Sequence, residues 1–238
     1  MSRLPEHLHS VPLNQIAIPG SHNSFSFYLD VNSEIGPDQK DNKDFISYFR
    51  WLGKFVLKNW SVTQSLTFQQ QLEHEIRYFD LRVAARKNMD GFYFLHSLYS
   101  ISVEEGINEI IAFMNVHPKE VILLDFNHFY EIDEHNHKKL TELIIEKFGA
   151  KMCRNLDMNS VTLEMLWKSN LQVIVFYQND NIKDNVMCWP RTTIEAHWGN
   201  KECIADLIKF LENHYQSTRS PSKFHVTQGV VTPSLLLQ

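Results

Sequence analysis

The sequence has few cysteines, no long apolar run and no strong excess of charge of one sign. Its three cysteines are scattered without a Cys-x-x-Cys pair, as expected for free thiols in a reducing compartment, and they are Cys153, Cys188 and Cys203. The longest apolar stretches, at 121–124 and 173–177, are far shorter than the roughly 18 residues that suggest a membrane span. These features argue against a disulfide framework and against a transmembrane helix.

The beginning of the chain and its net charge argue against two further classes. Residues 1–10 lack the apolar segment of a secretory signal, and a formal charge of −5 does not fit a nucleic-acid partner. The 238 residues are 43% hydrophobic and 12% aromatic, enough for a sizeable core, and no linker or low-complexity tract divides them. We therefore expect one domain over residues 1–238, located in the cytoplasm.

Short apolar runs alternate with helical patterns, which is typical of βα units around a parallel sheet. About six strands are predicted, at 13–18, 77–83, 92–95, 121–126, 171–177 and 224–231, with an extra piece near 191–198. Helices are predicted at 66–76, 102–116, 133–148, 162–169 and 201–215, the second of them starting with a capping box of Ser102 and Glu105. A (β/α)₈ barrel typically needs ~250 residues, so the chain has room for most of one.

Two histidines stand where predicted strands end. The first strand breaks at Pro19-Gly20 and presents His22 and Asn23, and the strand at 92–95 runs directly into His96. Barrel enzymes carry their chemistry at the carboxyl ends of strands, so two imidazoles placed there can flank one substrate as general base and general acid. The alternative is that each histidine only satisfies the backbone of its own loop.

Charged side chains lie on the predicted strand 77–83. Alternation places Phe79 and Leu81 on one face, and Asp80 and Arg82 on the other. A buried acid and a buried arginine must be paired or bound to something. They form either a salt bridge inside the barrel or an arginine that a carboxylate holds toward a phosphate.

The predicted strand 121–126 repeats this pattern. Asp125 and Asn127 share the inward face with Val121 and Leu123, while the intervening apolar residues face the helices. Four strands therefore direct two histidines, two acids, an arginine and two asparagines toward one mouth. Packing alone does not explain this convergence.

Four segments, in this order, resemble the X domain of phosphatidylinositol-specific phospholipase C. They are Ile18-Pro-Gly-Ser-His-Asn-Ser24, Gln71 with Ile76-Arg-Tyr-Phe-Asp-Leu-Arg82, Leu95-His96, and Glu120-Val-Ile-Leu-Leu-Asp-Phe-Asn-His128. The similarity covers nearly the whole chain, and the nearest pattern is that of small animal proteins with little more than this domain. It implies an α/β fold, a distorted TIM-like barrel that is incomplete at the C-terminus. It also implies cleavage of phosphatidylinositol-type lipids to diacylglycerol and an inositol phosphate.

The resemblance assigns roles to both histidines. His22 matches the general base that takes the proton of the inositol 2-hydroxyl, and His96 matches the general acid that protonates the diacylglycerol oxygen. Because the attacking oxygen belongs to the headgroup itself, a cyclic inositol phosphate is the expected first product, which water then opens.

The segment Asp80-Leu81-Arg82 implies catalysis without a metal cofactor. It is similar to the Asp-x-Arg of bacterial enzymes, in which a guanidinium takes the place of calcium, whereas calcium-dependent members have Glu-Leu-Asp. One fixed cation at Arg82 can stabilise the charge that develops on the phosphorane. We therefore expect a calcium-independent enzyme without metal ligands.

Two positions depart from the family pattern. Asn23 stands where bacterial members have an aspartate that supports the acid histidine. The family also has an aspartate on a late barrel strand that orients the base histidine, and we expect it beyond 224–233, the last segment that resembles the family. Either the chain is a shortened form, or another residue orients His22.

Further candidates for substrate or membrane contact have two interpretations each. The segment Asp44–Trp60 carries a basic stripe beside an aromatic and aliphatic face, typical of a helix at a membrane surface, or else it plugs the bottom of the barrel. Tyr177 and Trp198 can stack on an inositol ring or pack in the barrel. Together with Asp125 and Asn127 they are the predicted substrate-binding residues.

Other assignments are also open. His128, His135 and His137 suggest a metal site, but a His-x-His pair points to opposite sides of a helix or strand. A metal-dependent glycerophosphodiesterase on a similar barrel needs a carboxylate cluster, against which Arg82 argues. The remaining alternative is a catalytically impaired module that binds lipid or regulates a partner. Few Lys or Arg residues lie near the motifs, which favours an unphosphorylated headgroup.

Overall fold

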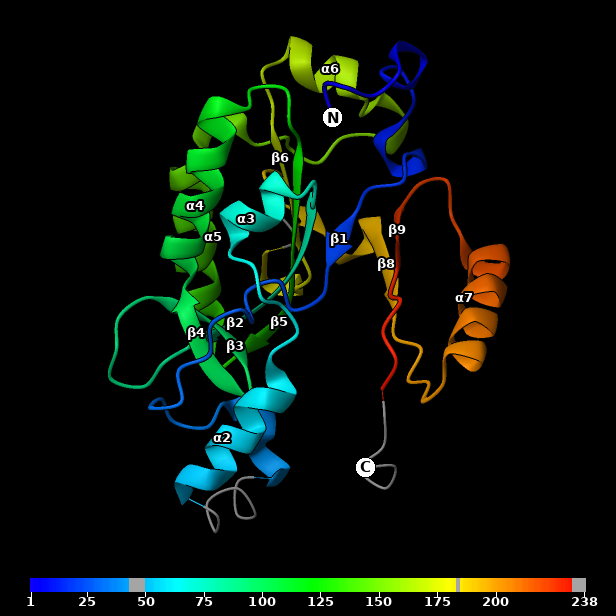
Figure 1. The fold of residues 1–238 in the computed structure, drawn as a ribbon. Helices are drawn as coiled ribbons and strands as arrows, with labels where there is room; N and C mark the ends of the chain where they lie inside the picture. Colours follow the sequence, from blue (N-terminus) through cyan, green and yellow to red (C-terminus); the bar gives the residue numbers. More distant parts are fainter. Residues whose placement is uncertain (43–49, 183–184, 233–238) are drawn as a thin grey trace.

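The computed structural model describes residues 1–42, 50–182 and 185–232, arranged as a mixed sheet with helices on one side and a second, smaller sheet opposite (Figure 1). The strands are β1 (Gly20–Ser21), β2 (Tyr78–Ala85), β3 (Phe92–His96), β4 (Leu98–Ser102), β5 (Ile122–Tyr130), β6 (Val173–Tyr177), β7 (Trp189–Pro190), β8 (Ile194–His197) and β9 (Phe224–Thr227). The helices are α2 (Arg50–Ser61), α3 (Phe68–Glu73), α4 (Val103–Val116), α5 (Glu134–Phe148), α6 (Leu163–Lys168) and α7 (Ile204–Thr218).

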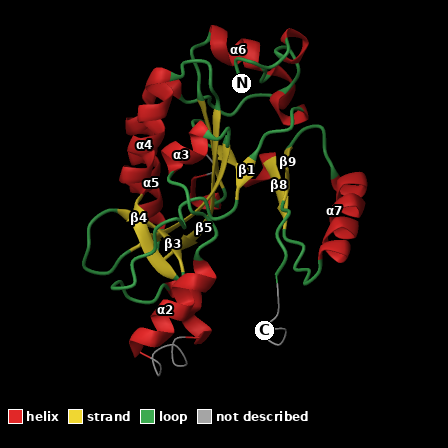
Figure 2. Ribbon diagram, in the orientation of Figure 1, coloured by secondary structure: helices red, strands yellow, loops and turns green. Residues whose placement is uncertain are grey.

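The main sheet has the strand order β4-β3-β2-β5-β6-β7, and β1 pairs with the first part of β2. Its pairs are parallel except for β2 with β3 and β3 with β4, which are antiparallel. Strands β8 and β9 form a separate parallel pair, and Figure 2 shows α7 on the outer side of this pair. In the described part of the chain the strands thus form an open, distorted TIM-like α/β arrangement and not a closed barrel.

Side-chain alternation along β5 divides the apolar core into two clusters. Ile122, Leu124 and Phe126 belong to the cluster that also contains the buried faces of α4 and α5. Val121 and Leu123 belong to a second cluster on the other side of the sheet. This is the division that the sequence predicts, and it leaves the second face of the sheet to carry the polar residues that follow Leu123.

Local sequence fixes where several helices begin. Ser102 caps α4 through a reciprocal capping box with Glu105, as predicted, and Thr67 caps the shorter α3 in the same way. The Asp133 side chain accepts a hydrogen bond from a backbone N–H at the start of α5, which ends at Gly149 with φ of 51°. The predicted elements at 162–169, 171–177 and 201–215 correspond to α6, β6 and α7, and the extra piece near 191–198 contains β8.

The predicted first strand, Leu13–Ile18, is wrong. Pro12 precedes a 3₁₀ turn at Leu13–Gln15, and the strand starts only at Gly20. The reason is that pairing with β2 begins where the Pro19 carbonyl accepts hydrogen bonds from the backbone of β2. The apolar residues before it instead fill the second core cluster.

The direction of β3 also differs from the prediction. The sequence suggested a parallel strand at 92–95, but β3 runs antiparallel to β2 and turns at Ser97, where φ is 63°, into the unpredicted strand β4. The capping box at Ser102 masked β4, because the helix signal begins on its last residue. The described residues accordingly contain nine strands, compared with about six predicted.

Among the described residues, no helix is both long enough and apolar enough to cross a bilayer.

Candidate active site

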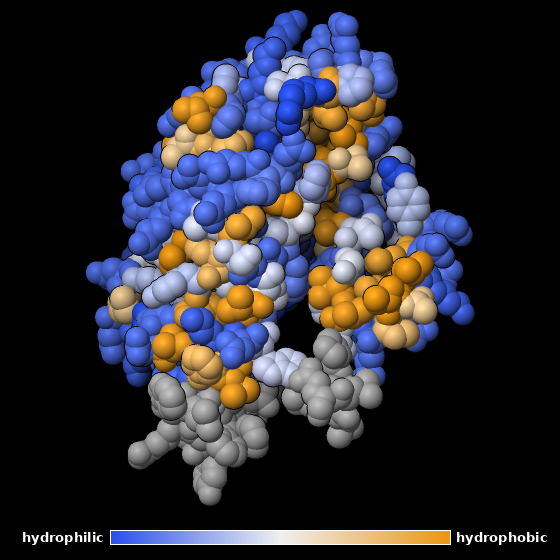
Figure 3. Space-filling view, in the orientation of Figure 1, coloured by the Kyte–Doolittle hydropathy of each residue, from blue (hydrophilic) through white to orange (hydrophobic). Residues whose placement is uncertain are grey.

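A cavity of about 1280 Å³ lies between the main sheet and the β8–β9 pair. Its polar end is lined by the predicted residues His22, Asp80, Arg82, His96 and Asn127. Its other walls are largely apolar and include Ile18, Leu123, Phe176, Ile194 and Phe224. Figure 3 shows the molecule hollowed between the side that carries α2 and the side that carries α7.

His22 follows β1, and both nitrogens of its ring have a partner. Nδ1 lies 2.9 Å from Oδ2 of Asp80, and a carboxylate only accepts, so Nδ1 carries a proton. Nε2 lies 3.1 Å from the amide nitrogen of Asn23, which donates, so Nε2 carries the lone pair. This tautomer leaves Nε2 as the basic atom.

Asp80 on β2 is the residue that orients His22. Its Oδ1 accepts a hydrogen bond of 2.7 Å from Asn127, and its Oδ2 accepts one of 2.9 Å from the backbone of Asn23. Burial raises the pKa of Asp80, but the His22 hydrogen bond and the positive charge of Arg82 outweigh burial and hold this pKa well below its usual range. The carboxylate therefore stays ionised beside the ring that it positions.

Asn23 lies between the two histidines. It is fully buried with φ of 43°, in the left-handed region that asparagine tolerates better than most residues. Its amide nitrogen lies 3.1 Å from Nε2 of His22 and 3.4 Å from Nδ1 of His96. The structure thus brings both imidazoles to one amide group, close enough to lie on two sides of one small substrate group.

His96 ends β3, and its ring is held by the backbone. Nδ1 lies 2.8 Å from the carbonyl oxygen of Ser61, so Nδ1 carries a proton and Nε2 is the atom that gains and loses one. Burial and then the positive charge of Arg82 lower the pKa of His96, while the bond to Ser61 opposes them.

Arg82 follows a bulge in β2, where the register with β5 shifts between Leu81 and Arg82. The guanidinium lines the cavity, and its Nε has no partner in the part of the chain that the structure describes. No ion pair joins Arg82 to Asp80 within those residues, because Asp80 faces His22 and Asn127 instead. Both predicted pairings of Arg82 with Asp80, as a salt bridge and as a carboxylate that holds the arginine, are therefore wrong. The guanidinium thus brings a positive charge to the cavity wall.

Asp125 does not reach the cavity, contrary to the prediction that it binds substrate. It is fully buried, and its carboxylate accepts hydrogen bonds of 2.6 Å from Tyr78, 2.7 Å from Gln178 and 3.3 Å from Asn127. Burial and the nearby charge of Asp80 raise the pKa of Asp125 to about 6. Asp125 therefore fixes the positions of Tyr78, Gln178 and Asn127, which line the cavity, through hydrogen bonds.

The two predicted stacking residues have different positions. Tyr177 is fully buried on the helix-facing side, where its hydroxyl lies 2.8 Å from Nδ1 of His137, so it cannot stack on a ligand in the cavity. Trp198 does line the cavity, and its ring stacks on His22 with the ring centroids 5.3 Å apart. Of the two, only Trp198 is placed to touch a substrate.

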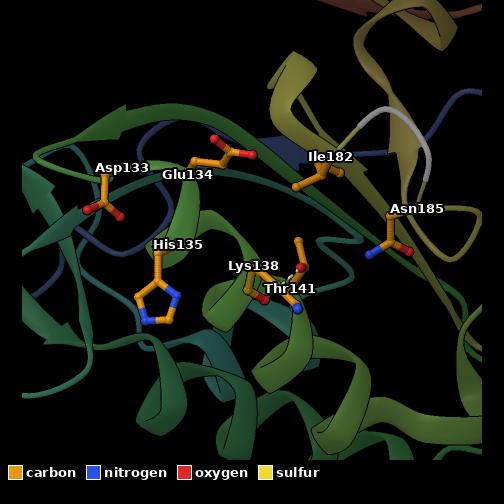
Figure 4. Close-up of a pocket in the computed structure, with 7 residues that line it drawn as sticks. All are labelled: Asp133, Glu134, His135, Lys138, Thr141, Ile182 and Asn185. Atoms are coloured by element: carbon orange, nitrogen blue, oxygen red, sulfur yellow. Dashed lines mark hydrogen bonds between the residues drawn. The ribbon is translucent and has the colours of Figure 1, made fainter.

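The three histidines considered for a metal site have different surroundings. His128 lines the cavity and lies 2.7 Å from Oδ1 of Asn127, whereas His137 is buried against Tyr177. His135 lines a smaller pocket at the start of α5, together with Asp133, Glu134, Lys138 and residues of the facing loop (Figure 4). Within the described ranges, no group of three or more acidic, histidine or cysteine side chains is arranged to hold a metal ion.

Sequence reasoning missed several residues of the site. Gln178 directly follows β6. Polar residues directly after the other strands were predicted as site residues, so the same rule indicates Gln178. Tyr78 lies on the same face of β2 as Asp80, so the alternation that selects Asp80 and Arg82 also indicates this residue. Thr63 and Gln64 contact the backbone of His22 from a loop about 40 residues away, and no sequence pattern indicated this contact.

Comparison with curated proteins found close relatives. The chain is 45% identical over 235 residues to PI-PLC X domain-containing protein 2 of Homo sapiens, covering 98% of this chain and 77% of that protein. It is 41% identical over 236 residues to PI-PLC X domain-containing protein 3 of Homo sapiens, covering 98% and 74%. Protein 1 of Danio rerio is 32% identical over 230 residues, covering 94% and 72%. No family model matches the chain.

Two bacterial proteins of known structure share the fold. Phosphatidylinositol-specific phospholipase C from Listeria monocytogenes superposes with a TM-score of 0.62 at 19% identity, over 99% of this chain and 79% of the bacterial one. A mutant of the Staphylococcus aureus enzyme gives a TM-score of 0.61 at 17% identity, over 95% and 74%. The predicted TIM-like fold is thereby confirmed.

Proposed function

Because the chain belongs to the family of PI-PLC X domain-containing proteins, we propose that it is a phosphoric diester hydrolase that cleaves phosphatidylinositol-type lipids. The products are diacylglycerol and an inositol phosphate. One observation carries the proposal: two imidazoles, one of them oriented by a carboxylate, reach the same amide group at the polar end of a large cavity. Two imidazoles this close together can act as base and acid on two sides of one phosphodiester.

In this proposal His22 is the general base. Its Nε2 removes the proton of the inositol 2-hydroxyl, and the resulting oxygen forms a bond to phosphorus. Asp80 stabilises the imidazolium that forms, through the bond of 2.9 Å to Nδ1. Asp80 thus takes the orienting role for which the sequence offered no candidate.

His96 is the general acid in the same step. The bond between phosphorus and the diacylglycerol oxygen breaks, and Nε2 of His96 gives its proton to that oxygen. Burial and Arg82 lower the pKa of the free His96, and an anionic phosphodiester in the cavity offsets the charge of Arg82. A water molecule then opens the cyclic inositol phosphate, with the two histidines in exchanged roles.

Arg82 supplies the positive charge near the phosphorus atom. Its guanidinium lines the cavity and has a donor without a protein partner among the described residues. A fixed cation there stabilises the charge of the phosphorane, so the reaction needs no calcium. Trp198 and Asn127 border the same space and are the proposed contacts of the inositol ring.

Contact with a membrane surface is proposed for α2. The predicted segment Asp44–Trp60 lies partly outside the described residues, but α2 exposes Phe55, Val56 and Trp60 to 50%, 51% and 44%. Its last residue, Ser61, bonds His96 at the cavity, so α2 does not plug the opposite end of the barrel. Figure 3 shows apolar surface near α2 and also near α7, across the hollow, so a lipid can approach the cavity between two apolar rims.

The test is release of labelled inositol phosphate from phosphatidylinositol vesicles, with and without a chelator. We expect release by the wild type that is unchanged in chelator, and a loss of about 10³-fold in His22→Ala and His96→Ala. Vesicle binding without release would favour a lipid-binding module instead. Release that requires manganese or magnesium would favour a metal-dependent glycerophosphodiesterase.

A further inference from the structure

The loop in which α2 ends contacts both catalytic histidines. The carbonyl oxygen of Ser61 lies 2.8 Å from Nδ1 of His96. Two residues later the hydroxyl of Thr63 donates a hydrogen bond of 2.8 Å to the backbone carbonyl of His22, and the side-chain amide of Gln64 donates another of 2.8 Å to the same oxygen. Four consecutive residues, 61–64, thus hold the two groups that exchange protons with the substrate.

The contact with His96 selects one tautomer. A carbonyl oxygen only accepts, so Nδ1 must carry a proton, and the titrating Nε2 is left for the cavity. Ser61 is the last residue of a twelve-residue helix, whose final carbonyl groups lack helical partners and carry partial negative charge. The helix end therefore also favours the protonated ring, a task for which the neutral side chain of Asn23 is poorly suited.

The contacts with His22 fix its backbone. Thr63 is itself held by Ser26, whose hydroxyl lies 2.8 Å from the Thr63 hydroxyl and accepts a hydrogen bond of 2.9 Å from its backbone N–H. The peptide that follows His22 leads into Asn23, with its positive φ of 43°. Two donors on the His22 carbonyl oppose rotation of this peptide, whose N–H donates the hydrogen bond of 2.9 Å to Oδ2 of Asp80, so they help to hold the backbone of His22 against that carboxylate.

We infer that residues 61–64 are a positioning segment for the catalytic pair, in which the Ser61 carbonyl fixes the tautomer of His96 and the side chains of Thr63 and Gln64 fix the backbone of His22. The inference rests on the proposed function for its effect on rate. Its geometric part concerns the free protein and is tested without substrate.

The first experiment compares side-chain variants in the hydrolysis of phosphatidylinositol vesicles. In the double variant Thr63→Val, Gln64→Leu we expect kcat to fall about tenfold with KM changed less than twofold, because the substrate is still bound but the base is misplaced. Thr63→Ser keeps the hydroxyl donor and should retain wild-type kcat. An unchanged kcat in the double variant, or a change in KM alone, would overturn the role of these side chains.

The second experiment measures the ring-nitrogen resonances of His96 by NMR. Val62→Pro removes the backbone hydrogen bond of 3.0 Å from Val62 to Lys58 and forces Ser61 out of helical conformation, whereas Val62→Ala preserves both. We expect the Nδ1–H tautomer in the wild type and in Val62→Ala, and its loss in Val62→Pro, while the amide resonances of residues far from α2 keep their wild-type positions. A wild-type His96 protonated on Nε2 in its neutral form would contradict the inference.

The two readouts separate this inference from the proposed function. If the wild type releases no inositol phosphate from any vesicle, the proposed function fails, and the NMR spectra alone decide whether residues 61–64 position the histidines. If release occurs but the tautomer is wrong, the positioning segment fails while the hydrolase proposal stands.

Discussion

The polar end of the cavity and the wall formed by β8, β9 and α7 hold their half-buried histidines in different ways. At the polar end, His22 and His96 have hydrogen-bond partners from Asp80, Asn23 and Ser61. In the wall, buried ring nitrogens of three histidines have no hydrogen-bond partner among the described residues, and these are His197, His214 and His225. The positions of the histidine rings are therefore fixed by directional hydrogen bonds in the first region and by packing in the second.

The difference shows which region carries the precision of the site. The partnered histidines come from the main sheet and the loops attached to it, whereas the β8–β9 pair has no strand pairing with that sheet in the described ranges. The wall contributes apolar surface and Trp198 to the cavity. We therefore expect substitutions at the polar end to change the rate of catalysis strongly, and substitutions in the wall to change mainly the stability of the wall.

The strongest test of this comparison is Asp80→Asn. The change removes the negative charge that orients His22 and stabilises its protonated form, so kcat/KM should fall about 10³-fold to 10⁴-fold. The matched control is Asp206→Asn on α7, an exposed carboxylate in the other region, for which no change is expected. A loss of less than tenfold in Asp80→Asn would show that His22 does not depend on this carboxylate.

Arg82→Lys tests the fixed cation. Lysine keeps the charge but loses the planar donors of the guanidinium, so kcat should fall about 10²-fold, and added calcium should not restore it. Arg86→Lys is the control. Arg86 directly follows β2 and pairs with Glu34 outside the cavity, so no change in kcat is expected. Rescue of Arg82→Lys by calcium would contradict the assignment.

Two core substitutions compare the stability of the regions. Leu124→Ala, in the fully buried centre of β5, should lower the free energy of unfolding by about 4 kcal/mol. Leu207→Ala, at the buried face of α7, should lower it by about 2 kcal/mol, because the wall has more freedom to collapse into the vacated space. Urea denaturation measures both values, and the reverse order would show that the wall is the more tightly packed region.

The smallest expected effect is a pH dependence of the wall. Burial lowers the pKa of His197 and of His225 from the ordinary value of 6.5. The neighbouring His214 lowers both pKa values further, Arg219 lowers that of His225, and the negative charge of Glu195 opposes these shifts. A depressed pKa in the folded state means that the unfolded state binds more protons, so stability falls as the pH drops through and below 6.5.

Hydrogen exchange of the α7 backbone measures this effect. Exchange of α7 should be faster at pH 5.5 than at pH 7.5, while that of β5 stays constant. The variant His214→Phe removes one charge that would form against His197, whose ring centroid lies 3.8 Å away, and should reduce the acceleration. Equal acceleration in α7 and β5 would mean that acid acts on the whole fold.

The inward-facing residues of the central strands could be predicted, because alternation in a strand is a local property. Asp80, Arg82 and Asn127 line the cavity, as the alternation of side chains along a strand predicts. The same rule applied to β6 groups Tyr177 with Val175 on the helix-facing side, so the error at Tyr177 was avoidable. The direction of β3 is set by the connection 86–91, where Asn88 and Gly91 have positive φ, and because Asp90-Gly91 is a hairpin signal this error was avoidable as well.

The sequence by itself determined the two-faced strands, the helix starts and, through its motifs, the family of this protein, because these depend on residues that are near one another in the chain. Tertiary structure decided which atoms hold the histidines. Ser61 is 35 residues from His96, Thr63 is 41 from His22, and Asp80 is 57 from Asn23, the neighbour of His22. Such contacts depend on how whole elements pack, and neither composition nor periodicity specifies that packing.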